Sequence, residues 1–294
     1  MTRAAIGIVG GSGLYAMEGV TDLEEIWVET PFGAPSDAVI LGRVDGTPVA
    51  FLPRHGRGHR FAPHEINYRA NIWALKSLGV RWLMSVSAVG SLREEIVPGD
   101  IVVVDQFLDR TRARPSTFFE KGVVAHVGFG HPVCEVLRGI LVEACRSTGA
   151  RMHDGGTYVC MEGPQFSTRA ESFMYRGLGA SVIGMTNLPE AKLAREAEIA
   201  YASLAMATDY DCWHESEEHV SVEAVVAVLR ANVVKAERVL RAAIPRLASA
   251  PPSAAWSALD FAVMTAPEAI PAHKRRELAL LLDRVLPPAQ ENPA

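Results

Sequence analysis

Two aspartates, Asp209 and Asp211, follow a short apolar run at residues 201–207. Small and apolar residues dominate the run, which predicts a buried strand. If the chain stays extended beyond it, both carboxylates point to the same side, because residues two apart in a strand share a face. Open α/β sheets bind ligands at the carboxyl ends of their strands, so the pair marks a candidate site. The alternatives are solvated loop aspartates, a helix-capping aspartate, or a D-x-D metal site without nearby oxygen ligands.

A cationic stretch follows the strand predicted at residues 49–52. Residues 54–60 read Arg-His-Gly-Arg-Gly-His-Arg. Such a density of cationic and titratable side chains is unfavourable unless an anion neutralises it, and a planar guanidinium matches phosphate oxygens. The stretch therefore indicates a phosphate site, with a solvated basic loop as the alternative.

The glycine-rich loop at residues 10–13 follows the strand predicted at residues 6–9. Glycines let the backbone approach a ligand, and successive N–H groups can surround an anion. A dinucleotide-binding fingerprint can be fitted here, but no helix is expected to open after it. We interpret the loop as an anion site with the Ser12 hydroxyl as an additional donor. A plain tight turn is the alternative.

Strands and helices alternate along residues 1–245. Strands are expected at 6–9, 38–43, 49–52, 82–86, 101–104, 158–161, 181–183 and 201–207, and helices at 66–78, 132–147, 168–176, 189–198 and 221–244. This alternation predicts an α/β fold, a single domain with a central mixed β-sheet flanked by helices. We expect this domain at 1–247, a linker rich in Pro and Ser at 248–255, and a C-terminal helical extension at 256–294.

Five of the expected strands end in polar or glycine-rich breaks. These breaks begin at Gly10, Arg54, Ser87, Met185 and Asp209. Their convergence suggests one site at one edge of the sheet, which combines a phosphate-binding part, an aromatic residue and a pair of carboxylates. A phosphate and a flat nitrogen heterocycle are the ligands that such a site would suit.

Composition narrows the function classes further. The chain has 294 residues, a net charge of −5 and no basic block, so we expect no nucleic-acid partner. Its four cysteines are far apart and form no C-x-x-C motif, which is typical of free thiols in a reducing compartment. No signal peptide and no apolar stretch of about 18 residues is apparent, so we expect a cytoplasmic protein without a membrane partner.

Seven motifs resemble those of one known family in the same order. They are Gly10-Gly11-Ser12-Gly13, Arg54-His55-Gly56-Arg57, Asn67-Tyr68-Arg69-Ala70-Asn71, Gly90-Ser91-Leu92-Arg93-Glu94-Glu95, Asp105-Gln106-Phe107-Leu108-Asp109-Arg110-Thr111, Glu162-Gly163-Pro164-Gln165-Phe166 and Ala207-Thr208-Asp209-Tyr210-Asp211-Cys212-Trp213. Together they resemble the trimeric purine nucleoside phosphorylase family over roughly residues 5–245. The resemblance implies an enzyme, a pentosyltransferase that cleaves nucleosides reversibly with inorganic phosphate as co-substrate, without cofactor or metal, and assembles as a homotrimer.

The resemblance also implies a substrate and a role for individual residues. The expected reaction converts 5′-methylthioadenosine to adenine and 5-methylthioribose 1-phosphate. The residues that would hold phosphate are Ser12, Arg54, His55, Ser87 and Thr186. The residues that would contact the nucleoside are Ala88, Phe166, Ser167, Met185, Asp209 and Asp211. The 5′ group would lie in a pocket that a neighbouring subunit completes and that contains His126, Val222, Val225 and Val226. Gly184 departs from the asparagine of animal relatives. The alternatives are a preference for adenosine, inosine or methylthioinosine, a nucleoside-binding protein without turnover, and a NAD-dependent dehydrogenase.

The departure of adenine requires a proton at N7 in the transition state. An aspartic acid can supply this proton only if its pKa rises from about 3.9 by about 3 units, which is worth about 4 kcal/mol. Burial and a like-charged neighbour both raise a carboxyl pKa. We therefore expect Asp209 to act as the acid and Asp211 to support it.

Overall fold

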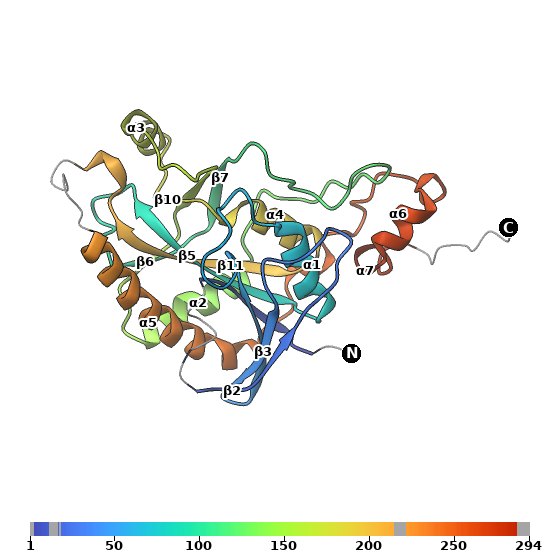
Figure 1. Cartoon of the computed structure of the whole chain (residues 1–294), viewed down its shortest axis with the longest axis horizontal. Coiled ribbons are helices and arrows are strands. Elements are labelled where there is room, and N and C mark those ends of the chain that lie inside the picture. The colour runs from blue at the N-terminus through green and yellow to red at the C-terminus, as the bar shows by residue number, and fades with distance from the viewer. Residues whose placement is uncertain (1–2, 12–16, 18, 215–221, 287–294) are drawn as a thin grey trace.

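The strand β5 (Trp82–Ser91) organises an eleven-stranded mixed sheet (Figure 1). The structure, a computed structural model, describes residues 3–11, 17, 19–214 and 222–286. One edge of β5 pairs in parallel with β11 (Ala200–Asp209), and the other edge pairs in parallel with β1 (Ile6–Gly10). These residues are almost all buried and apolar or small, as expected for strands that are covered on both faces.

The edge of β5 that faces β1 changes partner along its length. Residues 82–85 pair with β1, whereas Gly90 and Ser91 pair with the antiparallel strand β10 (Val182–Gly184). Residues 86–89 therefore face no described strand on this edge. Their backbone groups are free to contact a ligand or a side chain, and the sheet is open at this point.

The remaining strands extend the sheet in both directions. They are β2 (Val20–Ile26), β3 (Val39–Val44), β4 (Thr47–Pro53), β6 (Ile101–Val103), β7 (Gln106–Arg110), β8 (Met152–Asp154) and β9 (Thr157–Met161). The main path runs β2-β3-β4-β1-β5-β10-β9-β7, while β11 pairs also with β6, and β6 with β8. Antiparallel pairs occur together with parallel ones, so the predicted mixed sheet is confirmed.

Helices cover both faces of the sheet (Figure 1). The helices α2 (Glu135–Ser147) and α5 (Val222–Leu247) pack together on one face, and α1 (Tyr68–Ser77) and α4 (Asn187–Glu196) pack on the other. Each pair buries its apolar stripe against the sheet and so forms one of two main hydrophobic clusters. The shorter helix α3 (Arg169–Gly177) begins with a capping box between Thr168 and Glu171.

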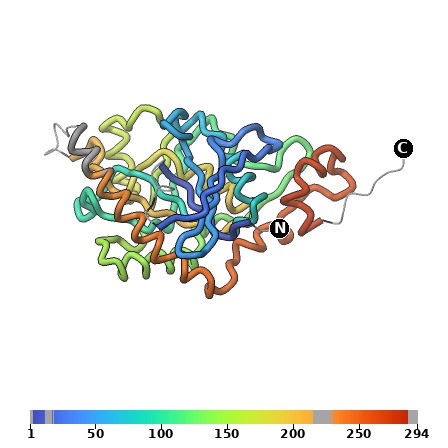
Figure 2. Tube along the Cα trace, turned by 60° about the horizontal axis from the view of Figure 1, so that its bottom comes forward, coloured from blue at the N-terminus to red at the C-terminus, as the bar shows by residue number. Residues whose placement is uncertain are grey.

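The chain beyond α5 packs against the α1/α4 side and projects at one end of the molecule (Figure 2). It contains the short helices η3 (Ala254–Ser257), η4 (Pro267–Ala269), α6 (Ala272–Glu277) and α7 (Ala279–Leu282). Leu259 and Leu278 are buried in the same cluster as α1 and α4, and Glu198 accepts a hydrogen bond of 2.9 Å from the Leu259 amide. Helices are present in this segment as expected, but each spans two turns or fewer.

The main differences between the structure and the sequence-based expectation concern three strands and the end of a fourth. We did not predict β2, β7 or β8: β2 has five exposed positions out of seven, and β8 has only three residues. The strand expected to end at residue 86 continues to Ser91. Its small polar residues indicated a loop, but pairing with β11 as far as Gly90, and with β10 at Gly90 and Ser91, holds this stretch extended. Within the described residues, no helix is long and apolar enough to cross a membrane.

Candidate active site

A cavity of about 570 Å³ lies where residues 86–89 of β5 lack a second strand. The ends of β1, β4, β10 and β11 and the middle of α5 complete its wall. Of the residues expected from the sequence, it brings together Arg54, His55, Ser87, Ala88, Phe166, Met185, Thr186, Asp209 and Asp211. The convergence of strand ends that we inferred from the sequence is therefore present in one cavity.

Other expected site residues lie elsewhere or cannot be placed. Ser167 lies next to Phe166, outside the cavity wall, and its carbonyl accepts a hydrogen bond from the Cys212 thiol. His126 is exposed, and its amide donates to Ala262 O at 2.9 Å, beside the C-terminal segment. Ser12 and the side chains of Val222, Val225 and Val226 are outside the described part of the chain.

A β-bulge positions the first aspartate of the pair. The register between β11 and β5 shifts between Ala207 and Asp209, so that Asp209 lies opposite Gly90. The Thr208 hydroxyl donates to Asp209 Oδ2 at 2.7 Å, and the Asp211 amide donates to Asp209 Oδ1 at 2.8 Å. These donors fix the orientation of the carboxylate. Gly90 leaves the necessary space, because a Cβ there would lie 3.0 Å from Asp209 Oδ1.

The second aspartate has a different environment. Asp211 has a φ of 53° and begins the short helix η2 (Asp211–Trp213). Its Oδ2 is buried and has no hydrogen-bond partner among the described residues. Burial raises the pKa of Asp211, and the neighbouring charge of Asp209 raises it further. The structure therefore makes Asp211, which we expected only in a supporting role, a candidate to hold the proton of the pair.

His55 faces the cavity as a neutral imidazole. Its Nδ1 lies 2.8 Å from Phe61 O, and since a carbonyl only accepts, we assign the proton to Nδ1. Burial lowers the pKa of His55 to about 4, and the charge of Arg54 also lowers it. His59 stacks on its ring with centroids 4.3 Å apart. At neutral pH, Nε2 is thus an acceptor that can receive a hydrogen bond from a P–OH group.

Two hydroxyl groups complete this part of the cavity. Ser87 and Thr186 line the wall, and each has a buried hydroxyl oxygen without a partner among the described residues. Thr186 precedes α4, yet its side chain makes no capping hydrogen bond to that helix. Buried hydroxyl groups are normally satisfied, so these two are available to a ligand.

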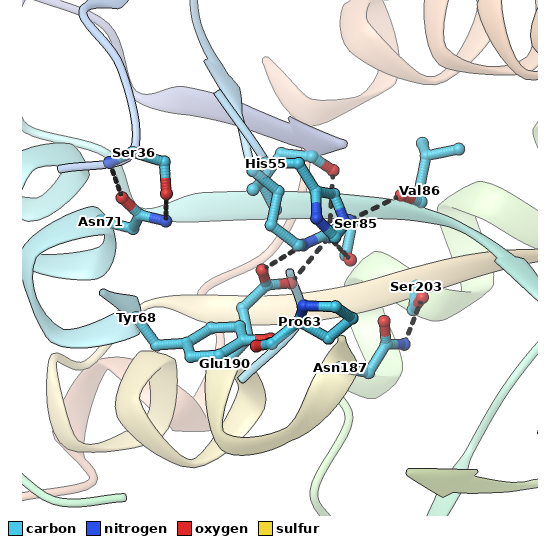
Figure 3. Close-up of polar contacts among 12 residues, drawn as sticks. Ser36, His55, Pro63, Tyr68, Asn71, Ser85, Val86, Asn187, Glu190 and Ser203 are labelled. Carbon is cyan, nitrogen blue, oxygen red and sulfur yellow. Dashed lines mark hydrogen bonds and ion pairs between the residues drawn. The ribbon is translucent and has the colours of Figure 1, made fainter. Parts of the chain in front are cut away.

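Arg54 is held more tightly than the sequence suggested. Its side chain is buried, and Nε and Nη2 donate to Glu190 at 2.7 and 3.0 Å. Its partners Glu190, Ser85 and Val86 are labelled in Figure 3. Nη2 also donates to Ser85 Oγ, and Nη1 donates to Val86 O on the open edge of β5. A guanidinium has five N–H groups, so one N–H of Nη1 has no acceptor among the described residues and could donate to a bound anion. Arg54 is therefore both a structural residue and a candidate phosphate ligand.

Sequence reasoning missed Arg114, which connects the loops around the cavity. Its side chain is buried, and Nη1 donates to Tyr68 Oη, Met185 O and Leu188 O at 3.0, 2.6 and 2.8 Å. Nη2 donates to Glu162 O. These bonds fix the backbone at Met185, at Leu188 and at the end of β9. Arg114 lies in a polar segment of weak pattern, so no local signal indicated its partners.

The fold and the cavity define a class of protein. The chain matches the Phosphorylase superfamily over residues 5–245 and belongs to that family. Curated relatives that it resembles are S-methyl-5'-thioadenosine phosphorylases. The one from Geobacter sulfurreducens is 58% identical over 278 residues, which are 94% of this chain and 97% of the relative. The one from Synechocystis is 56% identical over 293 residues, 98% of this chain and 90% of the relative.

Solved structures agree with this assignment. A methylthioadenosine phosphorylase from an Antarctic soil metagenomic library is 51% identical, with a TM-score of 0.93, and the alignment covers 96% of this chain and 100% of that chain. The methylthioadenosine phosphorylase of Schistosoma mansoni, solved in complex with adenine, is 36% identical with a TM-score of 0.81, covering 96% and 98% of the two chains. The fold and the family expected from the sequence are confirmed.

Proposed function

We propose that the protein catalyses the reversible phosphorolysis of S-methyl-5'-thioadenosine to adenine and 5-methylthioribose 1-phosphate. The observation that carries the proposal is that one cavity combines a buried carboxyl pair with an anion-binding group of hydroxyls, a neutral imidazole and an arginine N–H. The high identity to methylthioadenosine phosphorylases supports the same reaction. Among the described residues, no group of three or more His, Cys, Asp or Glu side chains is arranged to hold a metal ion.

The chemistry of the base follows from the carboxyl pair. As the bond between C1′ and N9 breaks, its electron pair moves to the purine, and a proton from the pair reaches N7. Because the two carboxyl groups are coupled, this proton belongs to the pair, and it is held mainly by Asp211, whose pKa is raised. The charged Asp209 then accepts a hydrogen bond from the 6-amino group of adenine. A 6-oxo group would place its oxygen against a carboxylate oxygen of Asp209, and this repulsion supports a preference for 6-aminopurines.

The chemistry of phosphate follows from the anion-binding group. Ser87 and Thr186 donate hydrogen bonds to phosphate oxygens, and His55 Nε2 accepts from the remaining P–OH. One phosphate oxygen then attacks C1′ as the ribosyl group develops positive charge. Donors that are already oriented stabilise the charge of the transition state without reorganisation. We assign Met185 and Phe166 to contacts with the sugar and the base, as both line the cavity.

The 5′ pocket supports a homotrimeric assembly. Phe166 lines the cavity but is 81% exposed, so the cavity within one chain is not closed around a substrate. His126, which we assign to the 5′ pocket, is also exposed. We propose that a neighbouring subunit closes the site. Residues 1–247 then form the catalytic unit, and the linker 248–255 joins it to the extension 256–294. We also propose that the enzyme is cytoplasmic. Light scattering that detects a fully active monomer at assay concentration would contradict the assembly.

A nucleoside panel tests the function directly. Adenine release from methylthioadenosine should require inorganic phosphate and should yield the sugar 1-phosphate in equal amount. Equal release in phosphate-free buffer would identify a hydrolase and reject the proposal. Adenosine, inosine and methylthioinosine in the same panel measure the preference for the base and for the 5′ group, and we expect the highest kcat/KM for methylthioadenosine.

A further inference from the structure

Tyr158 of β9 has a buried hydroxyl close to the anion-binding group. The residue is 0% exposed, and its ring packs against Phe107 with centroids 5.8 Å apart. The hydroxyl oxygen has no hydrogen-bond partner among the described residues. A polar group that is buried in this way is unfavourable unless the bound state gives it a role. Neither the family resemblance nor the cavity wall includes Tyr158, so its role needs a separate explanation.

Gly184 lies directly against this hydroxyl. Tyr158 is opposite Val182 in the parallel β9–β10 ladder, and its ring extends two residues further, to Gly184. A Cβ at Gly184 would lie 2.0 Å from Tyr158 Oη, 2.7 Å from its Cζ and 3.1 Å from Val89 Cγ1. Gly184 does not have a positive φ. The glycine is therefore required by space and not by backbone conformation, and the space is occupied by the Tyr158 hydroxyl.

The same hydroxyl lies at the cavity wall that carries two of the expected phosphate ligands. Gly184, against which the phenol oxygen lies, lines the cavity together with Ser87 and Thr186. Burial raises the pKa of Tyr158, whereas the Ser87 hydroxyl and the amide and hydroxyl of Thr186 lower it. The hydroxyl oxygens of all three residues are buried and unpaired among the described residues. A hydroxyl donates one hydrogen bond and accepts others, so an oxygen among these groups can determine where their hydrogens point.

We propose that Tyr158 is a positioning residue of the phosphate subsite, which orients the Ser87 and Thr186 hydroxyls toward the anion, and that Gly184 provides the space for it. With the anion bound, the phenol oxygen would accept from the Thr186 amide and donate to Ser87 Oγ, two bonds that are not formed among the described residues here, so that the Ser87 hydrogen is directed to phosphate. Orienting donors before the ligand arrives strengthens binding because less freedom is lost on association. The inference rests on the proposed function, since it assumes that the anion is phosphate.

The test compares Tyr158→Phe with wild type. The variant keeps the ring and removes only the oxygen. We expect the KM for phosphate to rise about ten-fold, as if one hydrogen bond from the Ser87 hydroxyl to the charged ligand were no longer directed correctly. The Kd for phosphate, from phosphate-dependent melting without nucleoside, should rise equally, while the KM for methylthioadenosine should change less than two-fold. The matched control is Tyr175→Phe, since Tyr175 is a buried tyrosine of α3 outside the cavity wall.

The outcomes separate the positioning role of Tyr158 from the proposed function. An unchanged phosphate Kd in Tyr158→Phe, or a rise that Tyr175→Phe shows equally, would overturn the positioning role and leave the proposed function intact. A wild type that neither binds nor requires phosphate would overturn both.

A second pair of variants tests whether Gly184 provides the space for the Tyr158 hydroxyl. Gly184→Ala should lower the melting temperature and weaken phosphate binding, because the Cβ displaces the phenol. Tyr158→Leu removes the ring atoms that this Cβ meets, so the double variant should melt higher than Gly184→Ala alone. Stable and fully active Gly184→Ala, or a double variant that melts no higher, would contradict the inference.

Discussion

The Glu190 carboxylate accepts hydrogen bonds of 2.7 and 3.0 Å from Nε and Nη2 of Arg54, and each side chain is only 2% exposed. The Tyr201 hydroxyl donates a further bond of 3.0 Å to Glu190. The ion pair is neutral as a unit, and His55 beside it is neutral as well. Under the proposed function, these groups would bind phosphate mainly through oriented dipoles and not through excess positive charge.

Removing only one partner of the Arg54–Glu190 pair should lower the free energy of unfolding strongly. Glu190→Gln and Arg54→Met each leave a buried charge without compensation, which typically costs about 3–5 kcal/mol. Denaturant unfolding should show this loss of stability. The double variant Arg54→Met/Glu190→Gln should lose less stability than the sum of the losses in the two single variants. Arg3→Met at the exposed Arg3–Glu24 pair is the control, with an expected change of about 0–1 kcal/mol. Losses below about 1 kcal/mol in both single variants would contradict this account.

His55 should make the fold sensitive to acid. Burial lowers its pKa in the folded state to about 4, below the value of about 6.5 in the unfolded chain. The unfolded state therefore binds a proton first, and stability should decline as the pH falls from about 6.5 to 4. His55→Gln cannot titrate and should reduce this decline in urea unfolding curves. A decline of the same size in the variant would assign the acid sensitivity to other groups.

Glu196 should act in the opposite direction. Its carboxyl accepts from the Thr117 hydroxyl and the Phe118 amide, both at 2.7 Å, and burial raises its pKa to about 7. A folded-state pKa above the unfolded value means that the folded form binds the proton more tightly, so stability should fall as the pH rises from about 4.5 to 7. The size is on the order of 3 kcal/mol. Glu196→Gln should remove this pH dependence, and an unchanged slope would refute it.

The parts of the site that the sequence predicted are those with local signals. Asp209 and Asp211 follow an apolar run, and Arg54 and His55 follow another, so strand periodicity and residue type were sufficient to place them at one edge. The α/β class was predictable for the same reason, because each buried strand is a short apolar run. The strand β2 was not predictable, because an exposed edge strand with the sequence Val-Thr-Asp-Leu-Glu-Glu-Ile carries almost no apolar pattern.

The parts that could not be predicted depend on pairings between distant residues. Glu190 lies 136 residues from Arg54, and nothing in its helix indicates a buried acid. Arg114 binds Tyr68 of α1, the segment 185–188 and the end of β9 from a segment without periodicity. Tyr158 reads as an ordinary core residue of a strand, and only its contact with Gly184 relates it to the cavity. The open edge of β5 depends on the relative lengths of β1 and β10, which no local pattern contains.

Asp209→Asn provides the most direct test of base recognition. The amide oxygen can still accept from the Asp211 amide, and the Thr208 hydroxyl can turn to accept from the new NH₂, so the variant should fold. It can no longer share a proton with Asp211, and its NH₂ can face a 6-oxo group but not a 6-amino group. Loss of proton transfer typically costs about 10²–10⁴-fold. The kcat/KM for methylthioadenosine should fall by this amount, and by more than the kcat/KM for methylthioinosine.

Asp211→Asn separates the two roles of the pair. The substitution removes the carboxyl whose pKa is raised but leaves the charged Asp209 in place. Activity toward methylthioadenosine should again fall by about 10²-fold or more, since proton transfer contributes this much. The ratio of methylthioadenosine to methylthioinosine activity should stay closer to that of the wild type, because Asp209 still accepts from the 6-amino group. The measurement is kcat/KM for both nucleosides in wild type and both variants, with melting curves to verify folding. If either variant keeps the aminopurine reaction within a few-fold of wild type, the carboxyl removed is not part of the acid that protonates the base.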